Sequence, residues 1–272
     1  ILASKGMQTF YQGDIADILI KDHAECGGLV TKLDLANYQV VVREPLSLHY
    51  RGQYDVFANS YPSIGGEIIL DGLRISHDVD SLDNIVKTMC ELQNAAKEKF
   101  YFRAKQSNSR CSNNANLSSG KIVGNTTHIS AIDQFGLSIG ITVTSGASGG
   151  YLVGDTGILM NNILGEPQLY PTGYHIQPPG KRLMSMVSPT TVRGTNEQLV
   201  VGSGGASRIP SAIFQVIHNI FTRDMNLSMA VEAPRIHFEN SWLELEQNAN
   251  IILPAISDQN IRQWSKKSMF FG

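Results

Sequence analysis

A pair of threonines that follows a polar stretch carries the clearest chemical signal in this 272-residue chain. Residues 105–120 are rich in serine and asparagine, and the run Asn125-Thr126-Thr127-His128 comes soon after them. A threonine hydroxyl is a weak nucleophile at neutral pH and needs an adjacent base. A threonine that becomes a chain's N-terminus supplies that base itself, because its α-amino group has a pKa of about 8. The junction therefore suits a precursor that cleaves itself before Thr126 and then uses Thr126 as the nucleophile.

A glycine-rich run at 202–206 (Gly-Ser-Gly-Gly-Ala) could meet the second need of acyl transfer. Such a turn lets successive backbone N–H groups converge on a developing oxyanion, and one donor of this kind contributes about 3 kcal/mol. A phosphate cradle is disfavoured, because no Gly-Lys-Ser/Thr follows. Residues 145–150 superficially resemble a serine-protease nucleophile turn, but a turn between strands explains them better. We interpret His128 as a packed strand histidine with no catalytic role.

Helices and strands must position these residues, and their predicted order along the chain indicates a mixed α+β layered fold. Helical spacing predicts helices at 15–24, at 33–36 behind a Thr31 cap, at about 82–102, and from Pro210 onward. Strand-like runs occur at 40–42, 46–50, 128–132, 137–144, 158–161 and 199–201. Asp133, Asp155 and Asp224 are expected at turns or caps.

Composition narrows the class of function. The chain is 42% hydrophobic and 17% charged with a net charge of -2, so it has no basic footprint for nucleic acid or for an anionic membrane. No apolar run reaches the roughly 18 to 20 residues of a membrane-spanning helix. Cys26, Cys90 and Cys111 are widely spaced, which favours free thiols over disulfides or a zinc site. The start shows no signal peptide, but this absence means little if the chain is a fragment. The compartment is therefore unknown: a cytoplasmic protein is slightly favoured, and a periplasmic or secreted one is open because the native N-terminus is expected to be missing.

The motifs occur in an order that resembles the γ-glutamyltransferase family (γ-glutamyltranspeptidase or glutathione hydrolase), whose members are N-terminal-nucleophile hydrolases. The resemblance covers nearly the whole chain, and many co-linear motifs make it specific. It rests on residues 10–16, 27–31, 34–36, 43–52, 126–130, 142–144, 154–162, 188–190, 202–209 and 233–237.

This resemblance implies a four-layer αββα sandwich that needs no cofactor and no metal. It implies that residues 1–125 are the end of a large subunit, with a flexible linker at about 105–125. Residues 126–272 would then begin a small subunit that is cut short, so the chain is expected to be a partial polypeptide of a divergent bacterial branch. The two subunits would stay paired after cleavage, and the protein could also form a homo-oligomer.

The resemblance also assigns roles in catalysis. Thr126 matches the nucleophile, which attacks the carbonyl of Asn125, is freed as a new N-terminus, and then forms an acyl-enzyme with a γ-glutamyl group. Water or an acceptor amine resolves that intermediate. Thr144 matches a threonine that hydrogen-bonds the nucleophile, and Gly205 and Ala206 match the oxyanion hole.

The substrate pocket resembles the family less closely. Glu166 matches an acidic residue that holds the substrate α-ammonium, and Ser185 matches a serine that contacts the α-carboxylate. Well-known members carry an asparagine two residues after the second threonine, where this chain reads Ser145-Gly146. Ile163 replaces a glutamine, and Met186 replaces the second of two serines. Ser145 is nevertheless expected to contact the substrate. The nucleophile chemistry is therefore a firmer expectation than specificity for glutathione.

Three functions follow from these residues. The first is γ-glutamyl acyl transfer, by hydrolysis or transpeptidation of γ-glutamyl amides such as glutathione. The second is an amidase or acylase of the same nucleophile class with another acyl substrate. The third is a catalytically inactive remnant, for which the test is whether the chain splits before Thr126.

Overall fold

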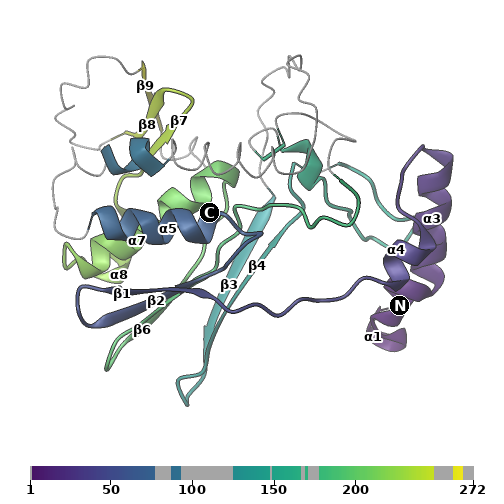
Figure 1. The fold of residues 1–272 in the computed structure, drawn as a ribbon, viewed down its shortest axis with the longest axis horizontal. Coiled ribbons are helices and arrows are strands. Elements are labelled where there is room, and N and C mark those ends of the chain that lie inside the picture. Colours follow the sequence, from purple (N-terminus) through teal and green to yellow (C-terminus); the bar gives the residue numbers. More distant parts are fainter. Residues whose placement is uncertain are drawn as a thin grey trace.

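A computed structural model describes residues 2–76, 87–92, 125–147, 149–166, 169–170, 178–247 and 260–265 (Figure 1). Helices and strands both occur, as the α+β prediction requires. Most of the predicted linker at 105–125 and most of the predicted helix at about 82–102 lie outside these ranges. Residues 87–92 of that helix are described, and they are helical.

Four helices form the N-terminal part: α1 (Leu2–Lys5), α2 (Gln8–Gln12), α3 (Asp14–Glu25) and α4 (Lys32–Ala36). Ile15 and Leu19 of α3 form a small core with Val153. The predicted Thr31 cap of α4 is confirmed, because the Asp34 N–H donates to the Thr31 hydroxyl at 3.2 Å within a capping box. These helices lie at one end of the molecule, at the right of Figure 1.

The predicted strand at 40–42 is wrong. These three valines lie in an extended segment without regular structure, where the side chains of Val40 and Val42 are 83% and 94% exposed. β-Branched residues favour strands only where a neighbouring strand and a buried face accompany them.

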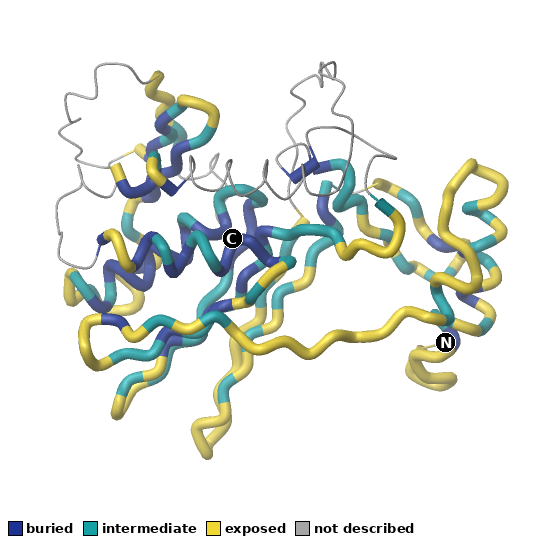
Figure 2. Tube along the Cα trace, in the orientation of Figure 1, coloured by how far each residue is buried: buried dark blue, intermediate teal, exposed yellow. Residues whose placement is uncertain are grey.

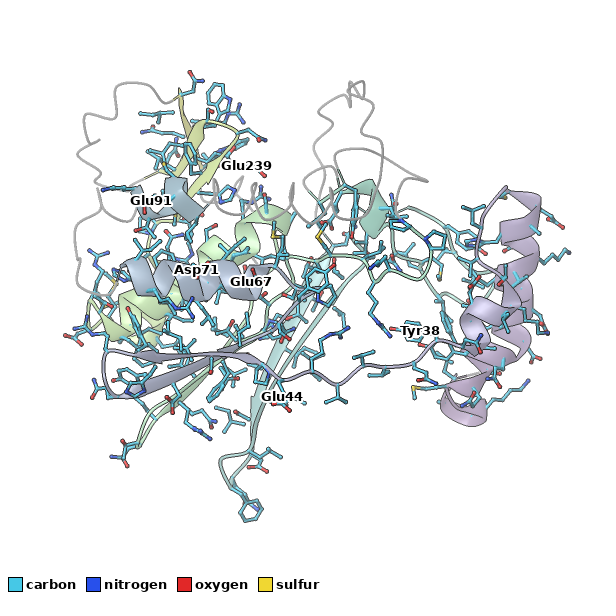
Figure 3. All side chains as sticks on the ribbon, in the orientation of Figure 1. Tyr38, Glu44, Glu67, Asp71, Glu91 and Glu239 are labelled. Carbon is cyan, nitrogen blue, oxygen red and sulfur yellow. The ribbon has the colours of Figure 1, made fainter. Side chains whose placement is uncertain are left out.

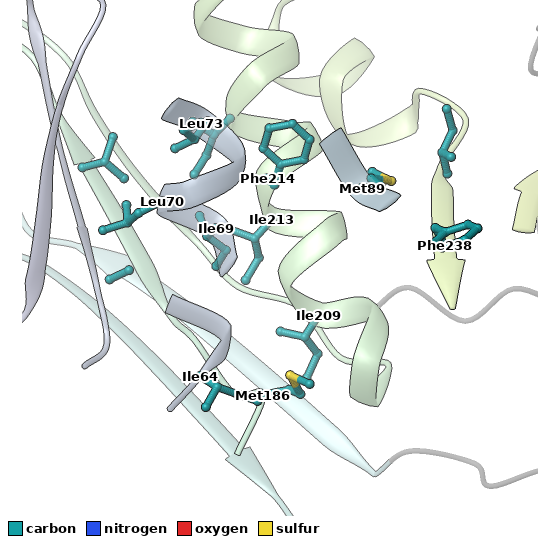
Figure 4. Packing of buried hydrophobic residues seen from close by; sticks show 14 of the residues in the cluster. Ile64, Ile69, Leu70, Leu73, Met89, Met186, Ile209, Ile213, Phe214 and Phe238 are labelled. Carbon is teal, nitrogen blue, oxygen red and sulfur yellow. The ribbon is translucent and has the colours of Figure 1, made fainter. Parts of the chain in front are cut away.

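The main sheet has four antiparallel strands in the order β1 (Leu46–Tyr50), β2 (Tyr54–Ala58), β5 (Thr190–Arg193) and β6 (Gln198–Val201). Two helices, α5 (Gly65–Ile75) and α7 (Ile209–Phe221), pack together on one face of it. Figure 4 shows their contact, where Ile69 and Leu73 of α5 face Ile213 and Phe214 of α7. Pro210 in the first turn of α7 confirms the predicted helix start.

The hairpin of β3 (Thr126–Ile132) and β4 (Ser138–Thr144) lies against the other face of the sheet. Side chains alternate along β6, so Leu199 and Val201 pack toward the helices while Val200 points to the hairpin. The Ser130 hydroxyl donates to the Val200 carbonyl at 3.0 Å and ties the two layers together. Figure 2 shows that the outer side of the hairpin is largely exposed.

A third sheet follows at the C-terminal end: β7 (Ile236–Glu239) pairs antiparallel with β8 (Trp242–Glu246), which pairs parallel with β9 (Asn260–Trp264). The helix α8 (Leu227–Glu232) precedes it. The predicted strand at 158–161 is wrong, because this segment makes only isolated bridges, Leu152 to Leu159 and Gly146 to Asn162. Two short 3-10 helices, η1 (Ile163–Gly165) and η2 (Ala206–Arg208), complete the described elements.

Candidate active site

Thr126 and Thr144 face each other across the β3–β4 hairpin. They are paired residues in the strand register, and the Thr126 hydroxyl donates to the Thr144 Oγ1 at 3.0 Å. Thr144 Oγ1 also accepts a hydrogen bond from the Gly146 N–H at 3.0 Å. The Thr144 hydroxyl is therefore held in place by the following turn, and it in turn orients the Thr126 hydroxyl.

The carbonyl group before Thr126 is held as well. The Ser145 N–H donates to the carbonyl oxygen of Asn125 at 3.2 Å. A hydrogen-bond donor at this oxygen polarises the carbonyl and stabilises negative charge that forms there during attack. The bond between Asn125 and Thr126 thus has its nucleophile oriented on one side and its oxygen bound on the other.

The turn after Thr144 is built on a second backbone contact. The Asn162 N–H donates to the Ser145 carbonyl at 2.8 Å, and the Ala147 N–H donates to the Asn162 carbonyl at 3.2 Å. Gly146 between them has φ 63°, and a Cβ there would lie 2.7 Å from the Asn162 carbonyl oxygen. Only glycine fits both the left-handed backbone and this close approach.

Gly205 and Ala206 form the turn that leads from β6 into α7. Gly205 has φ 108° and Ala206 has φ 54°, which is costly for a residue with a side chain. Neither amide donates a hydrogen bond within the part of the chain that the structure describes. Two successive N–H groups are therefore available to an incoming oxyanion.

The segment before this turn packs against the β3–β4 hairpin. The Ser130 hydroxyl donates to the carbonyl of Val200, and the ring of His128 packs so closely on Gly202 that a Cβ there would overlap it. These contacts place the start of the glycine-rich run beside β3, the strand that begins with Thr126.

Tyr170 contacts the backbone at Glu166 with its N–H and the backbone of Met184, the residue before Ser185, with its hydroxyl. The Tyr170 N–H donates to the Glu166 carbonyl at 2.9 Å, and its hydroxyl donates to the carbonyl of Met184 at 3.0 Å. The Glu166 side chain is buried, and burial raises the pKa of its carboxyl. Among the described residues no hydrogen bond joins either side chain directly to Thr126.

His128 is confirmed as a packed strand residue. Its two ring nitrogens lie 2.7 Å from the Thr142 hydroxyl and 2.8 Å from the Ser130 hydroxyl, and burial lowers its pKa. Asp133 is also confirmed as a turn residue, since its carboxylate accepts from the N–H groups of Phe135 and Leu137. Across the described ranges no cluster of three or more metal-ligating side chains occurs, and no helix is long and apolar enough to cross a membrane.

Sequence reasoning missed a second group of polar residues beside the oxyanion turn. His237 and Glu239 of β7 lie close to Ser207 and Ser211 on the far side of that turn. The motif at 233–237 supported the family resemblance, but no spacing in the sequence joined it to residues 207–211.

The chain is similar to known proteins in sequence and in structure. The sequence model of the family described as Gamma-glutamyltranspeptidase matches residues 1–107 and 77–263, which is nearly the whole chain. The chain belongs to the gamma-glutamyltranspeptidase family. The glutathione hydrolase proenzyme of Escherichia coli (strain K12) is 29% identical over 290 residues, covering 89% of this chain and 50% of that protein.

Other relatives of the chain bear a different name. The acylase ACY 1 proenzyme of Pseudomonas sp. (strain SE83) is 28% identical over 284 residues, covering 91% of this chain and 50% of that protein. The crystal structure of cephalosporin acylase from Bacillus halodurans matches with a TM-score of 0.70 at 22% identity, over 91% of this chain and 50% of that one. This match shows that the two chains share a fold, and it confirms the predicted α+β class. The chain spans about half the length of the curated relatives it matches.

Proposed function

We propose that the chain is cleaved between Asn125 and Thr126, and that Thr126 then transfers γ-glutamyl groups from γ-glutamyl amides to water or to an amine. The observation that carries this proposal is the paired arrangement at that bond. The Thr126 hydroxyl is 3.0 Å from Thr144 Oγ1, and the Asn125 carbonyl oxygen accepts the Ser145 N–H.

Cleavage follows from this arrangement by a simple sequence of bonds. The Thr126 oxygen attacks the carbonyl carbon of Asn125 while the Ser145 N–H stabilises the oxyanion. The bond from that carbon to the Thr126 nitrogen then breaks, and an ester replaces the amide. This break frees the Thr126 α-amino group, which takes up the hydroxyl proton. Water then hydrolyses the ester, which releases the carboxyl group of Asn125 and restores the Thr126 hydroxyl. The α-amino group, with a pKa of about 8, can act as the base for that hydroxyl.

Turnover would use a second set of donors. Thr126 attacks the γ-carbonyl of the substrate, and the amides of Gly205 and Ala206 stabilise the oxyanion of the tetrahedral intermediate. Glu166 would bind the α-ammonium group, since a cation beside this buried carboxylate offsets the loss of hydration that raises its pKa. Ser185 and Ser145 would contribute hydroxyl groups to the α-carboxylate and the glutamyl chain.

A second candidate is an acylase of the same nucleophile class. Ser145, Ile163 and Met186 replace polar residues of the glutamyl pocket, and two relatives with 28% identity are named acylase ACY 1 proenzyme. Both candidates use the same threonine and the same oxyanion turn. They differ only in the acyl group that the pocket accepts.

The decisive experiment compares Thr126→Ala with Thr127→Ala by intact-mass measurement of the purified protein. Thr127 is the matched control, because it is the next residue of β3 and its side chain is exposed on the opposite face. Wild type and Thr127→Ala should yield two fragments that divide before Thr126, and Thr126→Ala should stay whole. An uncut wild-type protein would instead support the inactive-remnant hypothesis.

The substrate class is tested on the cleaved protein with anilides. Hydrolysis of a γ-glutamyl anilide should exceed hydrolysis of an unrelated acyl anilide, and the Thr126→Ala protein should hydrolyse neither. A rate on the γ-glutamyl compound no better than on the other would favour the acylase candidate.

A further inference from the structure

A buried pair of serines joins two segments that lie far apart in the chain. Ser63, in the loop before α5, is 7% exposed, and Ser188, two residues before β5, is 1% exposed. Their hydroxyl oxygens are 2.8 Å apart, and the Ser63 hydroxyl also donates to the Val187 carbonyl at 2.7 Å. A serine hydroxyl has one proton, so the Ser188 hydroxyl must be the donor to Ser63. Ser63 is therefore bonded to two consecutive residues of the Ser185 segment (residues 185–188).

The backbones of the loop and of the Ser185 segment are joined as well. The Ser185 N–H donates to the Pro62 carbonyl at 3.0 Å, and the Ile64 N–H donates to the Ser185 carbonyl at 3.0 Å. Gly65, the first residue of α5, fits so closely that a Cβ there would overlap the Met186 carbonyl oxygen. The loop before α5 therefore sets the position of the Ser185 segment.

Side chains of the Ser185 segment alternate between two sides, as in a strand. Met186 and Ser188 are buried, and Figure 4 shows Met186 beside Ile64 in the core. Ser185 and Val187 lie on the other side and are half-buried. Since Met186 belongs to the core and Ser188 is bonded to Ser63, Ser185 supplies the hydroxyl of this segment that a substrate can reach.

The Ser185 hydroxyl is itself oriented by the segment. Its oxygen accepts the Val187 N–H at 3.0 Å, and within the part of the chain that the structure describes it donates to no group. Its proton is thus available to a carboxylate, which only accepts hydrogen bonds. Both peptide groups of Val187 are bound, the N–H by Ser185 and the carbonyl by Ser63. Ser63 therefore holds the residue that orients the Ser185 hydroxyl.

The Ser185 segment lies between other elements of the proposed site. At one end, the Tyr170 hydroxyl donates to the Met184 carbonyl at 3.0 Å, and the Tyr170 N–H binds the carbonyl of Glu166. At the other end, Pro189 packs on β4, where a Cβ on Gly140 would lie 3.3 Å from the Pro189 Cβ. The segment therefore connects the region of Glu166 to the strand that pairs with β3.

We propose that Ser63 is a positioning residue that fixes the Ser185 hydroxyl in the geometry that binds the α-carboxylate of a γ-glutamyl substrate. This inference rests on the proposed function of the site. The α-carboxylate does not react, so its binding is the same in the ground state and in the transition state and affects KM instead of kcat. An oriented hydrogen bond to a charged group changes affinity by about 10-fold or more.

The test compares two anilides with the purified protein. One is the γ-glutamyl anilide, and the other is γ-aminobutyryl anilide, which keeps the amino group and the reacting carbonyl but lacks the α-carboxylate. Ser63→Ala should raise KM for the γ-glutamyl anilide about 10-fold and leave kcat nearly unchanged. It should leave kcat/KM for γ-aminobutyryl anilide at the wild-type value. A merely structural role of Ser63 would lower kcat/KM for both compounds equally.

Ser60→Ala is the matched control. Ser60 lies in the same loop, but its hydroxyl donates to the Glu44 carbonyl at 2.9 Å, away from the Ser185 segment. Figure 3 shows Glu44 on the extended segment that leads to β1. Ser60→Ala should hydrolyse both anilides like wild type.

Self-cleavage, followed by intact mass in the same samples, shows whether each variant folds. If Ser63→Ala fails to cleave, Ser188→Ala decides, because it removes the hydroxyl that donates to Ser63 and keeps the bond from Ser63 to Val187. It should also raise KM for the γ-glutamyl anilide alone, by a smaller factor. The inference is overturned when the deciding variant keeps the wild-type KM, when its loss lies in kcat, or when both anilides lose equally.

The wild-type protein separates this inference from the proposed function. A wild type that neither cleaves nor hydrolyses either anilide overturns both proposals. One that cleaves but hydrolyses the two anilides equally well overturns the γ-glutamyl part of the proposed function. A wild-type preference for the γ-glutamyl anilide that Ser63→Ala retains in full overturns the role of Ser63 alone.

Discussion

Replacement of Thr144 by valine tests the hydrogen bond that orients the nucleophile. Valine has nearly the same shape as threonine and suits a strand, so the β3–β4 pairing should persist. It removes the oxygen that accepts the Thr126 hydroxyl at 3.0 Å and the Gly146 N–H at 3.0 Å. The Thr126 hydroxyl then rotates freely, and the turn that carries the Ser145 N–H loses one of its attachments.

The size of the effect follows from these two contacts. Each hydrogen bond contributes about 1 kcal/mol net, so about 2 kcal/mol of orientation is lost. Every 1.36 kcal/mol corresponds to a factor of ten in rate, so self-cleavage should slow by about 30-fold. The free energy of unfolding should fall by only about 1 kcal/mol, because the pair is half-buried and the freed groups can reach water.

The assay is the time course of self-cleavage, measured by intact mass after the protein is refolded or freshly translated. Thr142→Val is the matched control, since Thr142 lies two residues earlier on the same face of β4 and contacts His128 at 2.7 Å instead of Thr126. It should cleave at the wild-type rate. Equal rates for Thr144→Val and Thr142→Val would refute the role of Thr144 as the group that orients the nucleophile.

Two further predictions concern stability. Gly146→Ala should lower the free energy of unfolding by about 2 kcal/mol in a denaturant titration. Residue 146 has φ 63°, and a Cβ there would lie 2.7 Å from the Asn162 carbonyl oxygen. The control is Gly149→Ala, which should be nearly neutral because its Cβ would meet only the Asn162 Cβ at 3.5 Å. Burial raises the pKa of Glu166 above its unfolded value of about 4.3, so the unfolded chain ionises first and wild-type stability falls as pH rises through the interval between the two values. Glu166→Gln should remove this loss, so the Tm of the variant relative to wild type should rise with pH across that interval. A Tm difference that stays constant with pH would contradict the burial of an ionisable carboxyl at this position.

Much of the nucleophile's setting follows from local signals in the sequence. The Asp133 turn was predicted, and a short turn there forces the two flanking strands into one register. That register places Thr126 opposite Thr144, so two motifs that are 18 residues apart in the sequence become one site. The α3, α4 and α7 helices were likewise readable from apolar spacing and end signals.

The parts that sequence could not predict depend on long-range packing. The valines at 40–42 have strand-forming side chains, but no strand lies beside them. The contact of Ser211 with His237 joins residues 26 positions apart on a helix and a strand, where Gln215 of α7 also binds both backbone groups of Ile236 in β7. No periodicity reports such a contact, since it follows from the packing of whole elements.

The two reactions proposed for Thr126 would use different oxyanion donors. Self-cleavage takes the Ser145 N–H, on the turn that Gly146 and Asn162 fix, whereas turnover takes the amides of Gly205 and Ala206. The same hydroxyl serves both, so changes at Thr144 should slow both steps. Changes that displace the amides of Gly205 and Ala206 should slow only the later one. Two separate oxyanion sites therefore predict a protein that cleaves itself normally and then turns over with a lowered kcat.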